Sequence, residues 1–229
     1  MTSAPVSRRE RPAKPALSRE LIVRAGLAIL DAQGMDALTM RSVATALDTG
    51  AASLYVYVKN RDDLLDALLD EALGAVAFPK SDAGTWRDRL TLIVDRTTEA
   101  MARHDRLALV ALGSIPSSPN ALRILDNMVA ALRHTSLDPE AVSYSVDLLY
   151  LYATAAAAEM SAYRSRLITR SSADGYVREV EAAYEKLSAS DYPHLVALGP
   201  VMLSGSGDKR AVWMLRTLLN GILATPVDN

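Results

Sequence analysis

The chain has 229 residues, of which 50% are hydrophobic and 5% aromatic, and its formal net charge is −2. This length fits one sizeable domain, or a small domain followed by a larger one. The sequence has no cysteine, which excludes disulfides, thiolate metal sites and a cysteine nucleophile, and fits a cytoplasmic protein. The longest apolar run, residues 148–158, is shorter than the roughly 20 residues that a membrane span needs, so we expect no membrane segment.

Charge is distributed unevenly along the chain. Residues 1–61 contain nine basic and five acidic side chains, a net charge of +4, and the remainder carries −6. A small DNA-binding module attached to a larger domain that does not touch DNA gives this pattern, although chance clustering gives it too.

The first elements in the chain are a flexible arm and a helix. Residues 1–17 are polar and proline-bearing, which predicts a disordered arm. Ser18 is a good N-cap, apolar residues then recur at helical spacing, and Gly34 is typical of a helix C-terminus. The pattern therefore predicts a helix between Ser18 and Gly34.

Two short helices are predicted next. Thr39 can cap a helix that runs to Leu47, residues 48–50 form a turn, and a second helix covers residues 51–57. Two short helices joined by a three-residue turn form a helix-turn-helix. Its second helix enters the major groove of DNA, so it must expose small or polar side chains on one face and bury apolar ones on the other.

The rest of the chain also reads as helical, because Ala and Leu are abundant and β-branched runs are scarce. Asn60 can cap a helix ending near Gly74, and further helices are predicted after Thr85, after Pro119, over 138–166, over 174–187 and over 208–223, with a loop-rich segment at 188–208. The expected fold is all-α with about ten helices. Its parts are an arm (1–17), a three-helix helix-turn-helix domain (18–66) and a larger helical domain (67–229).

The stretch 38–68 resembles the TetR family of transcriptional regulators. The pattern begins at Leu54-Tyr55 and ends at Leu64-Leu65, with a basic residue at Lys59 and at Arg61. The resemblance covers residues 18–77 without gaps and extends weakly over the body. It implies a double-stranded operator DNA partner and contacts to bases or phosphates from Arg41, Ala51, Ala52, Ser53, Tyr55, Val56, Tyr57, Lys59 and Arg61.

Some residues depart from the family pattern. Asp48 stands where glycine is usual, and aspartate tolerates a left-handed turn. The Ala51-Ala52 pair carries no polar base reader, which shifts the expected readout toward apolar contacts such as a thymine methyl. On the arm, Arg8, Arg9 and Arg11 are candidates for a narrow minor groove, the alternative being a solvated tail.

The body carries the other predicted sites. The alanine-rich stretch 153–158 and the last helix predict close helix packing, and the resemblance implies a homodimer through the helices at 138–166 and 208–223; packing within a monomer is the alternative. The resemblance also implies a small-molecule effector, apolar or amphipathic, such as an antibiotic or an efflux substrate. The residues assigned to its pocket are Met101, His104, Met128, Tyr152, Met160 and Tyr163, each of which can also be ordinary core.

No catalytic or metal-binding set is visible, since His104, His134 and His194 lie far apart in the sequence. We therefore expect no enzyme activity, no metal and no cofactor. The favoured function is a ligand-responsive transcriptional repressor. The alternative is a small-molecule-binding or interaction protein whose DNA-binding head is weakened.

Overall fold

The computed structural model describes residues 16–169, 173–202, 204 and 207–227. Within these residues the chain forms eleven α-helices and one 3-10 helix, and no strand. The all-α prediction is confirmed. The elements are α1 (Arg19–Gln33), η1 (Met35–Ala37), α2 (Met40–Ala46), α3 (Ala51–Leu54), α4 (Arg61–Gly74), α5 (Trp86–Ala102), α6 (Leu107–Leu112), α7 (Pro119–Leu132), α8 (Pro139–Thr169), α9 (Ala173–Glu185), α10 (Pro193–Met202) and α11 (Gly207–Ala224).

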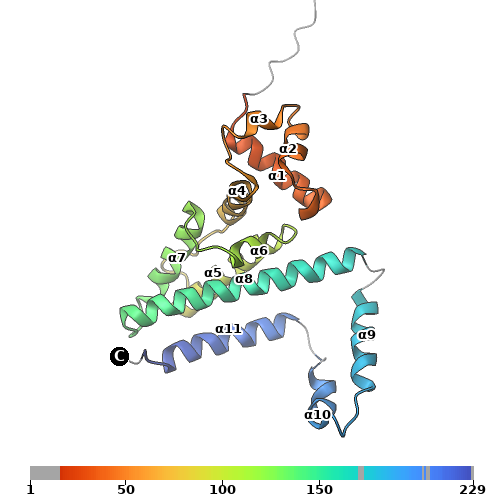
Figure 1. The fold of residues 1–229 in the computed structure, drawn as a ribbon. Coiled ribbons are helices and arrows are strands. Elements are labelled where there is room, and N and C mark those ends of the chain that lie inside the picture. The colour runs from red at the N-terminus through yellow and green to blue at the C-terminus, as the bar shows by residue number, and fades with distance from the viewer. Residues whose placement is uncertain (1–15, 170–172, 203, 205–206, 228–229) are drawn as a thin grey trace, which may run out of the picture.

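A small head at one end of the molecule is built from α1, α2, α3 and the start of α4 (Figure 1). Its helices begin where the sequence places capping side chains. Ser18 Oγ accepts a hydrogen bond from Leu21 N, Thr39 Oγ1 accepts from Ser42 N, and Asn60 Oδ1 accepts from Asp63 N. The caps therefore fix where α1, α2 and α4 start.

The head has its own apolar centre. The side chains of Ile22 and Leu38 are fully buried, as are those of Leu54, Leu64 and Leu68. They come from α1, the segment before α2, α3 and α4, so each element contributes to one core. Burial of a leucine side chain contributes about 1.5–3 kcal/mol, which lets so small a head hold its shape.

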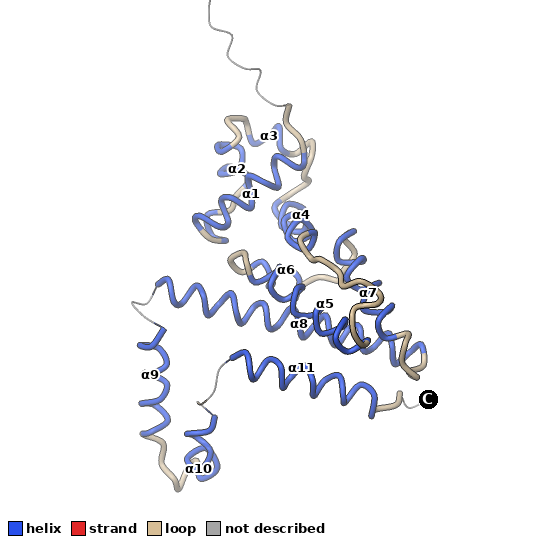
Figure 2. The backbone as a smooth tube through the Cα atoms, turned by 180° about the vertical axis from the view of Figure 1, so that it is seen from behind, coloured by secondary structure: helices blue, strands red, loops and turns tan. Residues whose placement is uncertain are grey.

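The body is a helical layer around α8. Helices α5, α6 and α7 pack against α8, and α4 connects the head to α6 and α7. Helix α11 runs back alongside α8, whereas α9 and α10 pack on each other and stand beyond one end of α8, as Figure 2 shows from behind. No helix in the described ranges is both long and apolar enough to cross a membrane.

Two predictions about the elements were wrong. The second motif helix is α-helical only over Ala51–Leu54, because residues 55–57 turn back through hydrogen bonds from Tyr57 N and Val58 N to Leu54 O. The predicted loop at 188–208 contains α10, since Pro193 fits the first helical turn and Pro200 lies near the helix end.

Candidate DNA-binding and ligand-binding sites

The exposed face after the α2–α3 turn is the first candidate site. Leu54 is 0% exposed and anchors α3 in the head core. The predicted base readers Ala52 and Ser53 are exposed, and Val56 is 79% exposed. Tyr55 and Tyr57 are exposed beside Val56, so the three form a continuous exposed face, as a surface that meets a partner would.

The turn before α3 has the conformation that the sequence predicts. Asp48 has a φ of 48°, the left-handed region that aspartate tolerates better than most residues. The turn is closed by hydrogen bonds from Asp48 N to Thr45 O, at 3.0 Å, and from Thr49 N to Ala44 O, at 2.9 Å. These bonds fix the angle between α2 and α3, so the exposed face of α3 has a defined direction.

Arg19 fixes the chain that leaves α3. Its Nη1 donates to Tyr57 O at 2.7 Å, and its Nη2 pairs with Asp63 Oδ1 at 3.1 Å. Asp63 Oδ2 also accepts from Lys59 N at 2.8 Å. The hydrogen bond from the Lys59 backbone, followed by the one from Arg19, lowers the pKa of the Asp63 carboxyl. Together Arg19 and Asp63 hold the segment 57–59 against α1 and α4.

Replacing Asp63 with alanine is expected to lower the free energy of unfolding of the head by about 1–2 kcal/mol at neutral pH, since both bonds need the carboxylate. Because folding lowers the pKa of Asp63, its contribution is present above the ordinary value of 3.8 and is lost as the pH falls below it. Urea unfolding at pH 7 and below pH 4 checks this. The difference in free energy of unfolding between the unaltered chain and Asp63→Ala should become smaller in acid. A difference that is the same at both pH values contradicts the prediction.

The predicted phosphate contacts differ in their surroundings. Arg41 and Lys59 are exposed, as are Tyr55 and Tyr57, at 54% and 36%. Arg61 is exposed as well, but its Nε donates to the backbone oxygen of Leu38 at 3.1 Å, and its Nη2 to that of Met35 at 3.3 Å. Arg61 therefore ties the start of α4 to the segment between α1 and α2. Arg8, Arg9 and Arg11 lie outside the described residues.

The six predicted pocket residues lie on α5, α7 and α8 and in the turn after α5. Met101 on α5 and Met128 on α7 are fully buried, and Met101 Sδ lies 4.0 Å from Thr154 Oγ1. Met160 is partly buried and Tyr163 is 41% exposed. Tyr152 is half-buried, and its hydroxyl donates to Ala211 O at 3.3 Å, joining α8 to α11.

His104 lies in the turn after α5. Its Nδ1 is 2.6 Å from Asp31 Oδ1 at the end of α1, so it joins the body to the head. Sequence patterns do not indicate this contact, because Asp31 is 73 residues away in the chain. No group of metal-ligating side chains gathers anywhere in the part of the chain that the structure describes.

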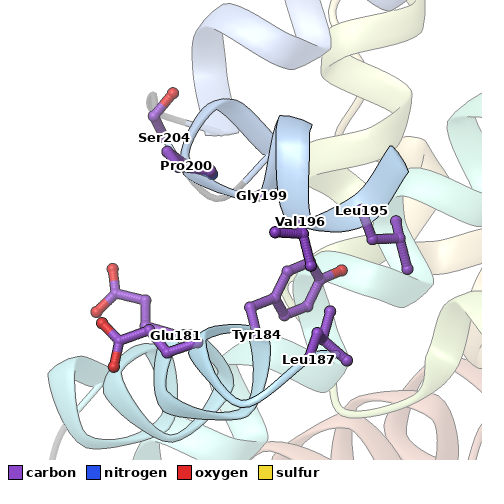
Figure 3. Close-up of a pocket in the computed structure, with 9 residues that line it drawn as sticks. Glu181, Tyr184, Leu187, Leu195, Val196, Gly199, Pro200 and Ser204 are labelled. Carbon is purple, nitrogen blue, oxygen red and sulfur yellow. The ribbon is translucent and has the colours of Figure 1, made fainter. Parts of the chain in front are cut away.

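Two hollows lie away from these residues. One, of about 420 Å³, opens between α9 and α10; Tyr184, Leu195 and Val196 give it an apolar wall, and Glu181 stands at its rim (Figure 3). The other, of about 300 Å³, lies between α1, α4 and the start of α7 and includes four carboxylates. Sequence patterns do not indicate either hollow, because each forms only where separate helices pack together.

Helices α8 and α11 present apolar side chains to solvent. On α8, Leu148 is 40% and Leu151 53% exposed, and on α11 Val212 and Trp213 are 67% and 60% exposed. The other face of α11, with Leu215, is buried. Both helices thus have an apolar side that the single chain leaves uncovered, as an interface between subunits would.

Comparison with known proteins decides the family. Residues 22–68 match the family "Bacterial regulatory proteins, tetR family", and residues 78–225, more than half of the chain, match "Tetracyclin repressor-like, C-terminal domain". The chain belongs to the TetR family. The resemblance seen in the stretch 38–68 is confirmed and now extends over the helical body.

Individual relatives with similar sequences are transcriptional regulators. An HTH-type transcriptional regulator of Saccharopolyspora erythraea is 31% identical over 79% of this chain and 77% of its own length. The HTH-type transcriptional repressor DrrR1 of Streptomyces coeruleorubidus is 35% identical over 59% of this chain and 51% of its own. The structure of the TetR family protein ActR of Streptomyces coelicolor in complex with actinorhodin has a TM-score of 0.81 and 33% identity, covering 92% of this chain and 97% of that one.

Proposed function

We propose that this TetR-family chain is a cytoplasmic transcriptional repressor that binds operator DNA as a homodimer and leaves it when a small molecule binds the body. The observation that carries the proposal is the exposed face of residues 52–57, held by the buried Leu54 and the left-handed turn at Asp48. A face so fixed and so open is suited to the major groove. The relative DrrR1 is named a transcriptional repressor, which supports repression rather than activation.

The proposal assigns a different role to each part of the chain. We assign DNA binding to residues 18–66, with the arm 1–17 as an additional contact, and effector binding and dimerisation to residues 67–229. The uncovered apolar sides of α8 and α11 support the dimer. Two heads are needed because successive half-sites on one face of DNA lie about 34–36 Å apart. The chain then acts by binding, without catalysing a reaction.

An apolar or amphipathic effector fits the residues of the body. Met101, Met128 and Met160 are flexible apolar side chains, which adapt to irregular ligands, and Tyr152 offers a polar tip. The complex of ActR with actinorhodin shows that a relative of this fold takes a small molecule. A ligand that favours a different spacing of the heads then lowers the affinity for DNA.

Removing the charge of Lys59 is expected to weaken operator binding and to reduce the slope of log affinity against log salt by about 1, since one phosphate contact is lost. The matched control is Lys80→Ala, an exposed lysine in the loop between α4 and α5. Fluorescence anisotropy titrations at several salt concentrations measure both slopes. Equal slopes for Lys59→Ala and the unaltered protein contradict the assigned contact.

The second candidate function is a small-molecule-binding or interaction protein whose DNA-binding head is weakened. The Ala51-Ala52 pair favours it, because neither side chain can donate or accept a hydrogen bond at a base edge. Screening antibiotics and efflux substrates by melting temperature and by operator release separates the two functions. A repressor shows ligands that both raise the melting temperature and release DNA. A protein with a weakened head shows the first effect and has no specific DNA to release.

A further inference from the structure

The hollow between α9 and α10 has the size and the lining of a small-molecule site. Its volume of about 420 Å³ falls within the range of about 300–1,000 Å³ that is usual for ligand pockets. Apolar side chains from both helices form its wall, among them Tyr184 on α9 and Leu195 and Val196 on α10 (Figure 3). Ligand pockets combine such a wall with a few polar groups that fix the orientation of the ligand.

The spacing of the two helices is set by a close contact and by the turn that joins them. Gly199 is buried, and a Cβ at this position would lie 3.6 Å from Tyr184 Cδ1, so the backbone of α10 lies against the tyrosine ring. In the turn, Tyr192 N donates to Ser188 O at 2.8 Å. The hollow is therefore bounded by helices whose relative position is fixed.

Helix α11 holds the end of α10. Arg210, on α11, uses its Nη2 to donate to the backbone oxygen of Met202, and to that of Ser204 at 2.7 Å. Ser204 also lines the hollow, and its hydroxyl donates to Val201 O at 2.9 Å. Because α10 is attached at both ends, the hollow is a built feature of this part of the chain.

Both charged side chains that line the hollow are acidic. Glu181 and Glu185 are exposed and lie one helical turn apart on α9, so they share one side of the helix. Neither carboxylate binds another side chain of the described residues. Residues 173–202 carry five acidic and two basic side chains, a net charge of −3. The rim of the hollow therefore attracts cations and repels anions.

We propose that the hollow between α9 and α10 binds an amphipathic organic cation. The apolar part of the ligand packs on Tyr184 and Val196, and its positive charge faces Glu181 and Glu185. A cation within about 6 Å of the tyrosine ring is also attracted by the ring face. Exposed ion pairs contribute little energy, so the apolar wall supplies most of the affinity and the carboxylates supply the selectivity.

This site is additional to the effector site assigned above. The residues assigned to the effector lie on α5, α7 and α8 and in the turn after α5, whereas the hollow is lined from α9, α10 and the segments that follow them. Binding in the hollow does not depend on the DNA-binding role of the head.

Tetraphenylphosphonium and tetraphenylborate test the proposal, because they share size and shape and differ in the sign of their charge. Isothermal titration calorimetry of the full chain should show at least about tenfold tighter binding of the phosphonium ion. Hydrogen exchange in peptides covering residues 181–200 should become slower when this ion binds.

Two substitutions at the rim test the selectivity. Glu181→Gln combined with Glu185→Gln removes the charge and keeps the shape, and should weaken phosphonium binding about three- to tenfold. The matched control combines Glu179→Gln with Asp191→Asn. It removes the same charge from α9 and the turn after it, outside the lining of the hollow, and should leave the affinity within about twofold.

A larger side chain in the hollow tests the location without changing charge. Val196→Phe fills part of the hollow and should weaken phosphonium binding at least about tenfold. Its control, Leu198→Phe, changes a side chain of the same helix that is 56% exposed and does not line the hollow. The control should bind as the unaltered chain does. Circular dichroism checks that both variants keep their helices.

Equal affinity for the two ions, or no binding of either, overturns the proposal. Equal losses in the rim variant and its control also overturn it, as does slower exchange confined to α5, α7 and α8. Exchange at residues 181–200 that slows with protein concentration and not with the phosphonium ion shows that a second subunit fills the hollow, which contradicts the proposal too. None of these outcomes bears on operator binding, which is measured separately.

Discussion

Replacing Leu54 with alanine should abolish specific operator binding while the body stays folded. Leu54 is the one buried residue of the four-residue helix α3, and it is 0% exposed. Truncating a buried leucine to alanine costs about 2–5 kcal/mol, a large share of the stability of so small a head. The exposed face at 52–57 then loses its fixed direction even where some head structure persists.

The measurement pairs anisotropy titration of the operator with unfolding followed by circular dichroism. The matched control is Leu122→Ala on α7, a leucine that is 50% exposed and lies outside the head. The control should keep both stability and operator affinity within error of the unaltered chain. Retained operator affinity in Leu54→Ala contradicts the assignment of α3 as the recognition helix.

Introducing a carboxylate at Leu151 on α8 is expected to separate the subunits and weaken operator binding at least a hundredfold. Leu151 is 53% exposed in the single chain and belongs to the uncovered apolar side that we assign to the dimer. A charge buried in the interface without a partner lowers the free energy of association of the subunits by about 3–5 kcal/mol. Each 1.4 kcal/mol corresponds to a roughly tenfold change in affinity. A separated subunit has one DNA-binding head, so it can contact only one of the two half-sites.

Light scattering after size exclusion gives the mass of Leu151→Glu and of its control, Leu122→Glu. The control places the same charge at a leucine of similar exposure, 50%, outside α8 and α11. The control should remain dimeric and bind operator. A dimeric Leu151→Glu, or an unaltered chain that is monomeric at micromolar concentration, removes the support for the α8–α11 interface.

Local features of the fold could be predicted from the sequence. Ser18, Thr39 and Asn60 mark the starts of three helices because a cap binds backbone only two or three residues away. Asp48 marks the turn because aspartate tolerates the left-handed backbone conformation that it has there. The end of α3 could not be predicted this way, since Tyr55 to Tyr57 have helix-compatible side chains and the early end is set by packing of the whole head.

Contacts between distant segments could not be predicted from the sequence. Arg19 reaches Tyr57 across 38 positions and His104 reaches Asp31 across 73, and no periodicity or spacing encodes such pairs. The resemblance to the TetR family located the helix-turn-helix correctly, and the comparisons extended it over the body. It did not predict that the side chains of Arg61 and His104 bind other residues of the same chain.

The most direct test of the central claim is a titration of the full chain against DNA from upstream of its own coding region and against scrambled DNA of the same length, at one fixed salt concentration. Specific binding by proteins of this kind exceeds non-specific binding by at least about a thousandfold. The proposed repressor should show that preference and lose it in Leu54→Ala. Equal affinity for the two DNAs, repeated with sequences selected from a random pool, would contradict the claim that the exposed face of residues 52–57 reads an operator.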